Sequence, residues 1–470
     1  MPTLIKNGTL ITAAETFQAD ILVENEQITQ IGRALAHPDA AVIDAAGKFI
    51  LPGGVDPHTH FDLPMFGTVS SDDHYTGHKA AAFGGTTTAM DFAGLEPQGF
   101  KYSVERWLEK AQKAAIDYSF HMNLTAMDDH LADGIPTLRE MGIRSLKVFT
   151  AYNGRLRLDD GGIFRALRIA GENGMLVMSH CENGDVIEQL IPEALAAGHT
   201  TPEWHALTRP AWGAVESTLR MCAMSAQADA PVYIVHMNVG GEADMLKYAR
   251  ERGLKVMGET CPPYLFFTID DLRRADGAKW ICSPPMRTAA DNARLWEALK
   301  DGTIQTIGTD HCPFFFDGTR PITYEGREIA IPGKELGRDD FTKIPNGLPG
   351  VQDRLPVLWT TAVRTGKLSP NQFVALTSTN PARIFGLYPR KGTLVPGADA
   401  DIVIWDPEKR MKYGVAHSHQ RTDYNLYEGW DLVGYPEKVF LRGKLIVDGE
   451  KWLGKAGDGQ FLKRGEGQVI

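Results

Sequence analysis

The chain of 470 residues lacks several features that would place it in other classes of protein. It has only five cysteines, at positions 181, 222, 261, 282 and 312, and they form no Cys-x-x-Cys pair. Five widely spaced cysteines cannot make a complete disulfide framework, so they favour reduced thiols. No apolar run approaches the roughly 18 residues that cross a bilayer, and the N-terminus lacks a signal-peptide core. We therefore expect a cytoplasmic protein that does not enter a membrane.

Basic residues are in the minority, because 49 Lys+Arg stand against 59 Asp+Glu and give a net charge of −10. A nucleic-acid-binding protein normally has a basic surface, so the composition argues against that class. Glycine-rich dinucleotide and phosphate loops are also missing. Hydrophobic residues make up 43% and charged residues 23%, which is ordinary for a globular protein. The length suggests two or three domains, or one large domain with an appendage.

Both ends of the chain have the alternating pattern of short β-strands. It occupies residues 4–11, 20–24 and 27–32, and returns in residues 391–395, 401–405 and 439–447. Neither group of strands is long enough for a good core alone. We therefore expect residues 1–51 and 389–450 to fold together into one small β-sandwich. Two unrelated β-rich ends are the alternative.

Between these ends, eight short apolar segments alternate with helical stretches. Strands of this kind are buried on both faces and indicate a parallel sheet covered by helices. Eight such units fit a distorted (β/α)₈ barrel over residues 52–388, and a doubly wound open sheet is the runner-up. The segments are residues 49–60, 86–92, 118–124, 145–151, 175–181, 232–238, 255–261 and 304–312.

Five of the eight segments carry side chains suited to metal binding: His58 and His60, Lys147, His180, His236 and Asp310. His58 and His60 are two residues apart, so on an extended strand they share a face. Each residue alone has a more common structural explanation, such as a satisfied hydrogen bond or a helix N-cap. Together they predict a metal site, because five strands place such residues where a barrel builds its active site.

The motifs resemble the hydantoinase/dihydropyrimidinase family of the amidohydrolase superfamily, and D-hydantoinases in particular. The resemblance covers essentially the whole chain and implies the barrel and terminal β-domain already described. It is carried by Leu4-Ile5-Lys6-Asn7-Gly8, Pro52-Gly53-Gly54-Val55-Asp56-Pro57-His58-Thr59-His60, Gly84-Gly85-Thr86-Thr87-Thr88, Ser283-Pro284-Pro285-Met286-Arg287, Gly308-Thr309-Asp310-His311-Cys312-Pro313 and Ile344-Pro345-Asn346-Gly347.

This resemblance implies a centre of two zinc ions bridged by a carboxylated lysine. A lysine amine surrounded by apolar strand residues fits that role, because burial disfavours its charged form and leaves a neutral amine to react with CO₂. The implied ligands are His58, His60 and Asp310 for one ion, His180 and His236 for the other, and carboxylated Lys147 as the bridge.

The resemblance also implies a cyclic amide hydrolase that opens 5,6-dihydropyrimidines, 5-monosubstituted hydantoins, or both, to N-carbamoyl amino acids. Hydroxide formed at the metal pair would attack a ring carbonyl. Asp310 would accept the water proton and return it to the leaving nitrogen. Tyr152 would donate to the developing oxyanion, and Ser283 and Asn346 would hold the cyclic imide edge.

Other members of the superfamily remain as alternatives. Allantoinase and dihydroorotase use nearly the same metal ligands, and dihydroorotase would need an arginine for its substrate carboxylate, which the sequence does not identify. A non-catalytic dihydropyrimidinase-related protein is disfavoured, because all six ligand residues are present.

Family resemblance further implies a homotetramer, with the C-terminal tail of residues 451–470 as a contact arm. Two departures from the family pattern stand out. Asn153 replaces a basic residue, and residues 315–333 suggest an inserted hairpin or lid close after Asp310.

Overall fold

Eight parallel strands form the centre of the computed structural model, which describes residues 2–65 and 67–470. Neighbouring strands follow the order of the chain, and a bridge between Thr59 and His311 joins the last strand region to the first. The predicted barrel is therefore confirmed. Its strands are β6 (Gly54–Thr59), β9 (Thr86–Ala93), β10 (Asp117–Asn123), β11 (Ser145–Phe149), β12 (Leu176–His180), β13 (Val232–Ile234), β14 (Val256–Thr260) and β15 (Thr306–Ile307).

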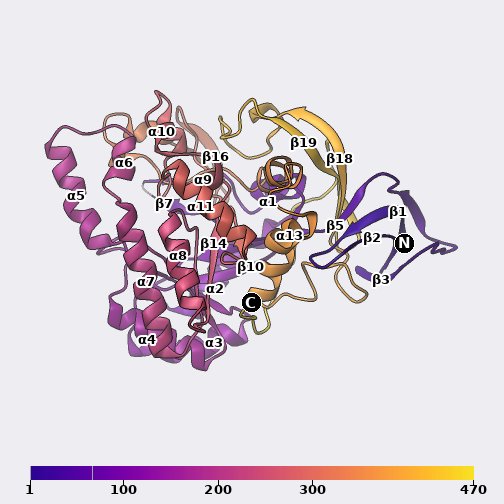
Figure 1. The fold of residues 1–470 in the computed structure, drawn as a ribbon, viewed down its shortest axis with the longest axis horizontal. Coiled ribbons are helices and arrows are strands. Elements are labelled where there is room, and N and C mark those ends of the chain that lie inside the picture. Colours follow the sequence, from indigo (N-terminus) through magenta and orange to yellow (C-terminus); the bar gives the residue numbers. More distant parts are fainter. Residues whose placement is uncertain (1, 66) are drawn as a thin grey trace.

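Helices follow the barrel strands and cover the outside of the barrel (Figure 1). Several begin at a residue whose side chain accepts a hydrogen bond from a backbone N–H of the first turn, as Asn183 does from Val186 at 3.1 Å. The helices are α1 (Thr76–Phe83), α2 (Phe100–Lys110), α3 (Asp129–Glu140), α4 (Asp160–Glu172), α5 (Gly184–Ala196), α6 (Glu203–Leu207), α7 (Ala211–Ala228), α8 (Gly240–Arg250), α9 (Pro263–Phe266), α10 (Ile269–Leu272), α11 (Ala289–Lys300), α12 (Arg354–Leu358), α13 (Pro370–Val374) and α14 (Asn380–Ile384).

Two π-helical and five 3₁₀-helical turns complete the helical part of the described chain. The π-helical turns η5 (Trp359–Val363) and η6 (Ala375–Thr379) continue α12 and α13 without a break. The 3₁₀ turns are η1 (Ala111–Lys113), η2 (Gly277–Trp280), η3 (Lys334–Gly337), η4 (Phe341–Lys343) and η7 (Val415–His417).

A buried arginine ties together the strands on either side of the barrel seam. Arg354, at the start of α12, is fully buried. Its Nη1 donates to the backbone oxygens of Val55 at 3.0 Å and Ile307 at 2.9 Å. Its Nη2 donates to Thr86 Oγ1 at 3.1 Å. One side chain therefore links β6, β9 and β15.

Strands from both ends of the chain form a second sheet beside the barrel, with the N-terminal strands and β18–β19 adjacent in Figure 1. Hydrogen bonds join its nine strands into one sheet in which β5 pairs with both β1 and β18. Apolar side chains of both ends pack into a common core that includes Ile21, Ile50 and Ile404. Both ends therefore fold together, as predicted. The strands are β1 (Thr3–Ile11), β2 (Thr16–Glu24), β3 (Gln27–Gly32), β4 (Ala41–Asp44), β5 (Phe49–Pro52), β18 (Ile402–Lys412), β19 (Asp431–Leu441), β20 (Lys444–Asp448) and β21 (Lys451–Trp452).

Two small hairpins lie near the ends of the barrel strands. The first pairs β7 (Pro64–Met65) with β8 (Thr68–Val69). The second pairs β16 (Arg320–Tyr324) with β17 (Arg327–Ile331), which confirms the hairpin predicted within residues 315–333. Thr68 Oγ1 donates to the backbone oxygen of Pro332 at 2.9 Å, so the two hairpins are in contact.

The C-terminal tail packs against the barrel of its own chain. Leu462 N donates to the Tyr118 oxygen at 2.7 Å, and the buried Arg464 donates to Ser145 Oγ at 2.8 Å. Both acceptors lie at or near the first residues of barrel strands. The tail therefore crosses the end of the barrel opposite to the strand ends that carry the candidate ligands, and its role in subunit contact stays a prediction.

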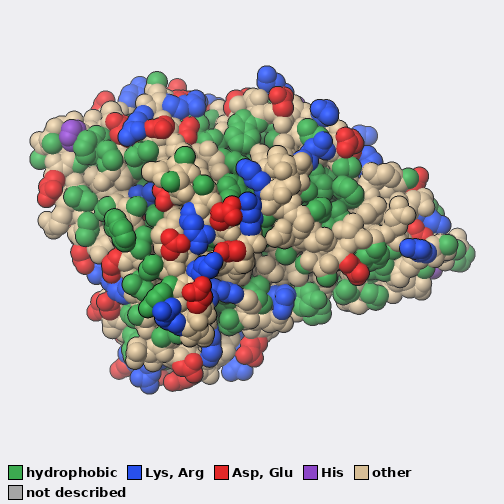
Figure 2. All heavy atoms as spheres, viewed as in Figure 1, with side chains coloured by type: hydrophobic (Ala, Val, Ile, Leu, Met, Phe, Trp, Pro, Cys, Tyr) green, Lys and Arg blue, Asp and Glu red, His purple; other side chains and the backbone are tan. Residues whose placement is uncertain are grey.

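Charge is mixed over the face in Figure 2, where acidic and basic side chains alternate without a large area of one sign. None of the helices in residues 2–65 and 67–470 is long and apolar enough to cross a membrane.

Candidate metal centre

A single cavity of about 280 Å³ lies at the carboxyl ends of the barrel strands. Every site residue predicted from the sequence lines it, although these residues are spread over almost 290 positions of the chain. They are His58, His60, Lys147, Tyr152, His180, His236, Ser283, Asp310 and Asn346. The structure therefore brings the whole predicted set together.

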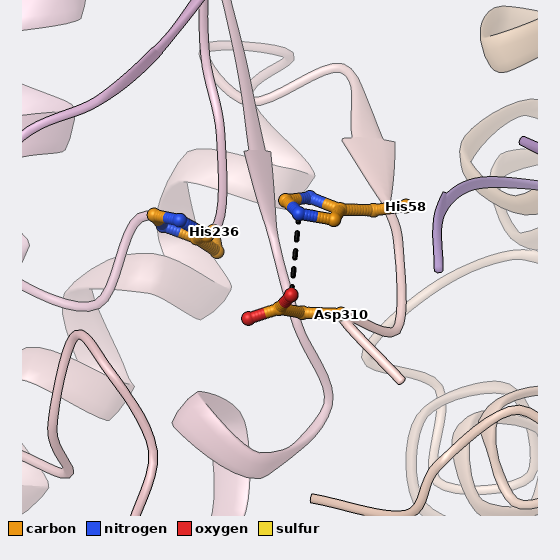
Figure 3. Close-up of side chains that lie close together, drawn as sticks. All are labelled: His58, His236 and Asp310. Atoms are coloured by element: carbon orange, nitrogen blue, oxygen red, sulfur yellow. Dashed lines mark ion pairs between the residues drawn. The ribbon is translucent and has the colours of Figure 1, made fainter. Parts of the chain in front are cut away.

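His58, His60 and Asp310 form the first group of closely spaced ligand atoms. Asp310 Oδ1 lies 3.2 Å from His58 Nε2 and 3.0 Å from His60 Nε2. Two ligands at zinc-like bond lengths around one tetrahedral ion are about 3.3 Å apart. In Figure 3 the Asp310 carboxylate faces the His58 ring, and His236 lies across from both. The spacing fits one shared cation.

His180 and His236 form the second group. His180 Nδ1 and His236 Nε2 lie 3.1 Å apart, which is again the separation of two ligands on one ion. Both side chains are almost completely buried. Burial lowers the pKa of His236, so its imidazole is neutral and has a lone pair for a metal.

Lys147 is the lysine whose side chain is buried in the wall of the cavity. Its side chain is 2% exposed, and its Nζ lies 4.8 Å from the centre of the Phe92 ring and 5.4 Å from that of Phe149. Within residues 2–65 and 67–470 it forms no ion pair. Burial lowers the pKa of Lys147 to about 8, which is well below the ordinary lysine value. An amine in this setting is easily obtained in its neutral form.

Three of the cavity residues have backbone conformations that are costly for residues other than glycine. The φ angles are 37° at His236, 52° at Asp310 and 68° at Tyr152. Left-handed backbone of this kind is held only where the surrounding structure imposes it, and it is concentrated at functional sites. Holding these three residues in this backbone conformation costs free energy, and the fold accepts that cost where it directs their side chains into the cavity.

Glu259, which the sequence analysis missed, orients the first ligand group. It is fully buried on β14, and its Oε1 lies 2.6 Å from His58 Nδ1. Because the carboxylate accepts this hydrogen bond, we assign the proton to Nδ1, and His58 Nε2 is left for a metal. Tyr233 donates to the other oxygen at 2.9 Å. A Cβ at Gly308 would lie 2.6 Å from Glu259 Oε2, so only glycine fits there.

Glu182 orients the second group in the same way, and it was also missed. Its Oε2 accepts hydrogen bonds from His180 Nε2 at 2.8 Å and from Arg209 Nη1 at 2.7 Å. Burial would raise the pKa of Glu182, but Arg209 and His180 outweigh it and hold the pKa at about 2. The carboxylate therefore stays ionised and fixes His180 with Nδ1 facing His236. Its place two residues after His180 was the available sequence signal.

Hydrogen-bonding groups occupy another part of the cavity wall. Asn346 Nδ2 donates to Ser283 Oγ at 3.0 Å, and Ser283 Oγ lies 3.2 Å from His205 Nε2. The Tyr152 ring centre lies 5.2 Å from that of His180. Burial raises the pKa of Tyr152 to about 12, so its hydroxyl remains protonated and able to donate.

Comparison with known proteins gives concordant matches over the full chain. The profile of the Amidohydrolase family matches residues 49–446. A D-hydantoinase of Geobacillus stearothermophilus is 44% identical, covering 99% of this chain and 97% of that protein. A D-phenylhydantoinase of Escherichia coli O7:K1 is 38% identical, covering 99% of this chain and 98% of that protein. The crystal structure of a dihydropyrimidinase from Brevibacillus agri NCHU1002 superposes with a TM-score of 0.95, at 45% identity and with 100% of both chains covered.

The barrel, the candidate ligands at its strand ends and the profile match define an amidohydrolase. Within that class, the chain belongs to the hydantoinase/dihydropyrimidinase family. The resemblance drawn from the sequence is thereby confirmed. Membership of this family implies a binuclear metal centre. The two groups of closely spaced candidate ligand atoms fit one, and His58, Asp310 and His236, which come from both groups, lie within 4.8 Å of one another.

Proposed function

We propose that this protein hydrolyses the ring amide of 5,6-dihydropyrimidines, 5-monosubstituted hydantoins, or both, and releases N-carbamoyl amino acids. The observation that carries the proposal is the cavity in which two groups of candidate ligand atoms, three in one and two in the other, lie around one buried lysine. The full-length similarity to a D-hydantoinase and to a dihydropyrimidinase supports the same substrate class.

The proposed metal is zinc, because neutral imidazoles and a carboxylate are ligands that zinc accepts. His58, His60 and Asp310 would hold one ion, and His180 and His236 the other. When bound, such a pair lowers the pKa of a water molecule and polarises a carbonyl group. Lys147 would supply the bridge after its amine adds to CO₂: the nitrogen lone pair forms a bond to carbon, one N–H proton leaves to solvent, and a carbamate anion results. The buried, unpaired Lys147 amine supports this step.

The remaining chemistry is assigned to side chains of the chain itself. Asp310 accepts a proton from the attacking water and returns it to the ring nitrogen as the C–N bond breaks. The Tyr152 hydroxyl donates a hydrogen bond to the carbonyl oxygen as that oxygen gains charge. Ser283 and Asn346 bind the edge of the cyclic imide and hold the scissile carbonyl in place.

A turnover panel with metal analysis of the same sample tests the proposal. We expect hydrolysis of dihydrouracil, hydantoin or 5-phenylhydantoin, with allantoin and dihydroorotate much slower, and two equivalents of metal per chain. Lys147→Ala and His58→Ala should lose both metal and turnover. If either variant keeps the full metal content and rate, the two-metal assignment is wrong. A preference for allantoin or dihydroorotate would move the protein to the alternative activity.

The role of Tyr152 has its own test. Tyr152→Phe removes only the hydroxyl, so we expect kcat to fall by roughly 10²–10³-fold with the metal content unchanged, as for loss of one oxyanion donor. Steady-state kinetics and metal analysis check this expectation. An unchanged kcat would remove Tyr152 from the mechanism.

We further propose a cytoplasmic homotetramer. Its support is the exposed apolar side chains near α6 and α7, where Trp212 is 80%, Leu207 44% and Leu219 41% exposed. All five cysteines are buried free thiols, which suits the reducing cytoplasm. Light scattering should give four times the chain mass, and Trp212→Glu should lower it. A monomeric wild-type protein would contradict the tetramer.

A further inference from the structure

An arginine without an acidic partner stands at the mouth of the cavity. Arg155 lines the metal-centre cavity, and it also lines an adjoining cavity of about 440 Å³ that shares Tyr152 and Asn346 with the first. Its side chain is exposed, and within residues 2–65 and 67–470 it forms no ion pair. The guanidinium is therefore free to bind a ligand that enters the cavity.

Two acidic residues beside this loop, Asp185 and Glu188, are already engaged by other residues. Arg157 pairs with Asp185 and donates to Asn153 Oδ1 at 3.0 Å. Asn153 Nδ2 in turn donates to Glu188 at 3.1 Å. Arg155 is thus the unpaired cation of a loop whose other arginine is neutralised.

The shape of the cavity relates Arg155 to the substituent of a substrate and not to its reacting ring. The metal-ligand side chains form the buried inner end, so the ring amide must lie there. The wall leading outward from that end is mostly apolar and contains Leu63, Pro64, Met65, Phe149 and Leu156. Arg155 is exposed, and it follows this wall at the opening. Of the described residues that line this cavity, Asp310 alone is acidic, and it belongs to the candidate ligand set.

We propose that Arg155 selects cyclic amides whose exocyclic substituent is a methylene chain that ends in a carboxylate, unlike dihydroorotate, whose carboxylate is attached directly to the ring. This inference rests on the proposed function and adds the class of substituent to it. An arginine can bind a carboxylate through two parallel N–H···O hydrogen bonds. The methylene groups of such a substituent lie along the apolar wall, and the carboxylate remains at the solvent-exposed opening. Because this contact is the same in the ground state and the transition state, it acts on KM more than on kcat.

The test compares two hydantoins that differ in charge and hardly in shape, hydantoin-5-acetate and hydantoin-5-acetamide. We expect Arg155→Gln to lower kcat/KM for the acetate about 10-fold, mainly through KM, and to change that for the acetamide less than 2-fold. Arg155→Lys should retain part of the preference, because it keeps the charge and loses the paired donors. Raising the salt concentration should weaken the preference of the wild-type protein, since the contact is exposed.

Arg168→Gln is the matched control. Arg168 is an exposed arginine on α4, and it does not line the cavity. This variant removes the same charge and should leave both rates unchanged. Metal content and turnover of unsubstituted hydantoin show that each variant is folded and active.

The proposal is overturned if Arg155→Gln lowers kcat/KM equally for the acetate and for the acetamide, because Arg155 would then act only on the loop conformation. It is also overturned if the wild-type protein hydrolyses the acetamide and not the acetate. In either case turnover of hydantoin itself leaves the proposed function standing. If the wild-type protein hydrolyses neither hydantoin nor dihydrouracil, the proposed function is rejected.

Discussion

At the scale of single residues, two buried carboxylates decide how the imidazoles of the centre are presented. Glu259 holds His58 by its Nδ1, and Glu182 holds His180 by its Nε2. Each leaves the other ring nitrogen facing the cavity, which is the tautomer that a metal needs. The orientation of the centre is therefore built into the chain before any metal binds.

Replacing Glu259 by glutamine tests this arrangement at nearly constant volume. The amide is uncharged and can offer N–H as well as oxygen to His58 Nδ1, so the required tautomer is no longer enforced. We expect the metal affinity to fall about 10–100-fold, as for other partners of metal-bound histidines. Titration of the metal-depleted protein with zinc, followed by activity and by metal analysis, measures this loss.

Asp353→Asn provides the control for that experiment. Asp353 is a buried carboxylate that accepts hydrogen bonds from Tyr413, Gln420 and Asn425 and does not line the cavity. Its change should lower stability and leave the zinc affinity unaltered. An equal effect of both substitutions on zinc affinity would show that Glu259 acts through general stability alone.

The convergence of the candidate ligands on one cavity could be predicted from the sequence and their carboxylate partners could not, for a physical reason. His58 and Lys147 follow from strand position, because the carboxyl ends of barrel strands meet at one rim. Glu259 lies on a different strand from His58, and 201 positions separate them. Contacts of that kind depend on strand tilt and side-chain rotamers, which no local pattern encodes.

At the scale of elements, the hairpin of β16 and β17 supports the loop that forms part of the cavity wall. Its buried residues Ile322 and Ile331 pack with Phe315 and with Val69 of β8. β8 pairs with β7, whose residues Pro64 and Met65 line the cavity. The hairpin itself does not line the cavity, so it acts through the loop.

Ile322→Ala should therefore loosen the cavity wall and leave the metal centre intact. Removing the buried side chain takes away the contacts that hold β8. We expect KM for 5-phenylhydantoin to rise about 3–10-fold while the metal content stays the same. Thr323→Ala, on the exposed face of the same strand, is the control and should behave like the wild-type protein. A wild-type KM for Ile322→Ala would show that the hairpin does not support the wall.

The order of these elements was largely predictable, but the apolar pattern alone does not divide one of them. Residues 49–60 form one apolar segment in the sequence, and the expected boundary between the terminal β-domain and the barrel falls inside it, after residue 51. The chain leaves the terminal sheet at the end of β5 and enters the barrel at β6. Gly53 lies at this junction, and a Cβ there would be only 2.0 Å from Thr87 Oγ1. A continuous apolar pattern cannot show such a change of sheet, because both parts are buried.

At the scale of the whole molecule, one buried lysine joins the barrel to the terminal sheet. Lys391 is 1% exposed, and its Nζ lies 2.6 Å from Asp117, 2.8 Å from Asp401 and 3.0 Å from Asp399. Asp117 begins β10 of the barrel, and Asp401 directly precedes β18 of the terminal sheet. Burial alone would lower the pKa of Lys391, but Asp401 and Asp117 raise it above the ordinary value. Lys391 is therefore charged at neutral pH and screens three carboxylates.

Lys391→Met should be among the most destabilising single substitutions outside the metal centre. The methionine fills similar space but leaves the buried Asp401 without its cation, and leaves Asp117 and Asp399 with only Arg442 and Arg390. Leaving a buried carboxylate unpaired typically costs about 3–5 kcal/mol. Because the folded-state pKa of Lys391 is raised, the stabilisation is full below about pH 10.5 and is lost as the pH rises through the folded value. Urea unfolding at pH 7.5 and at pH 11 measures the difference in the free energy of unfolding between variant and wild type, which should be larger at pH 7.5.

Lys444→Met is the control, because it removes the partly exposed pair with Asp458 and should cost less than about 1 kcal/mol at either pH. Equal losses for the two variants would mean that the terminal sheet and the barrel are held together by apolar packing and not by this buried charge.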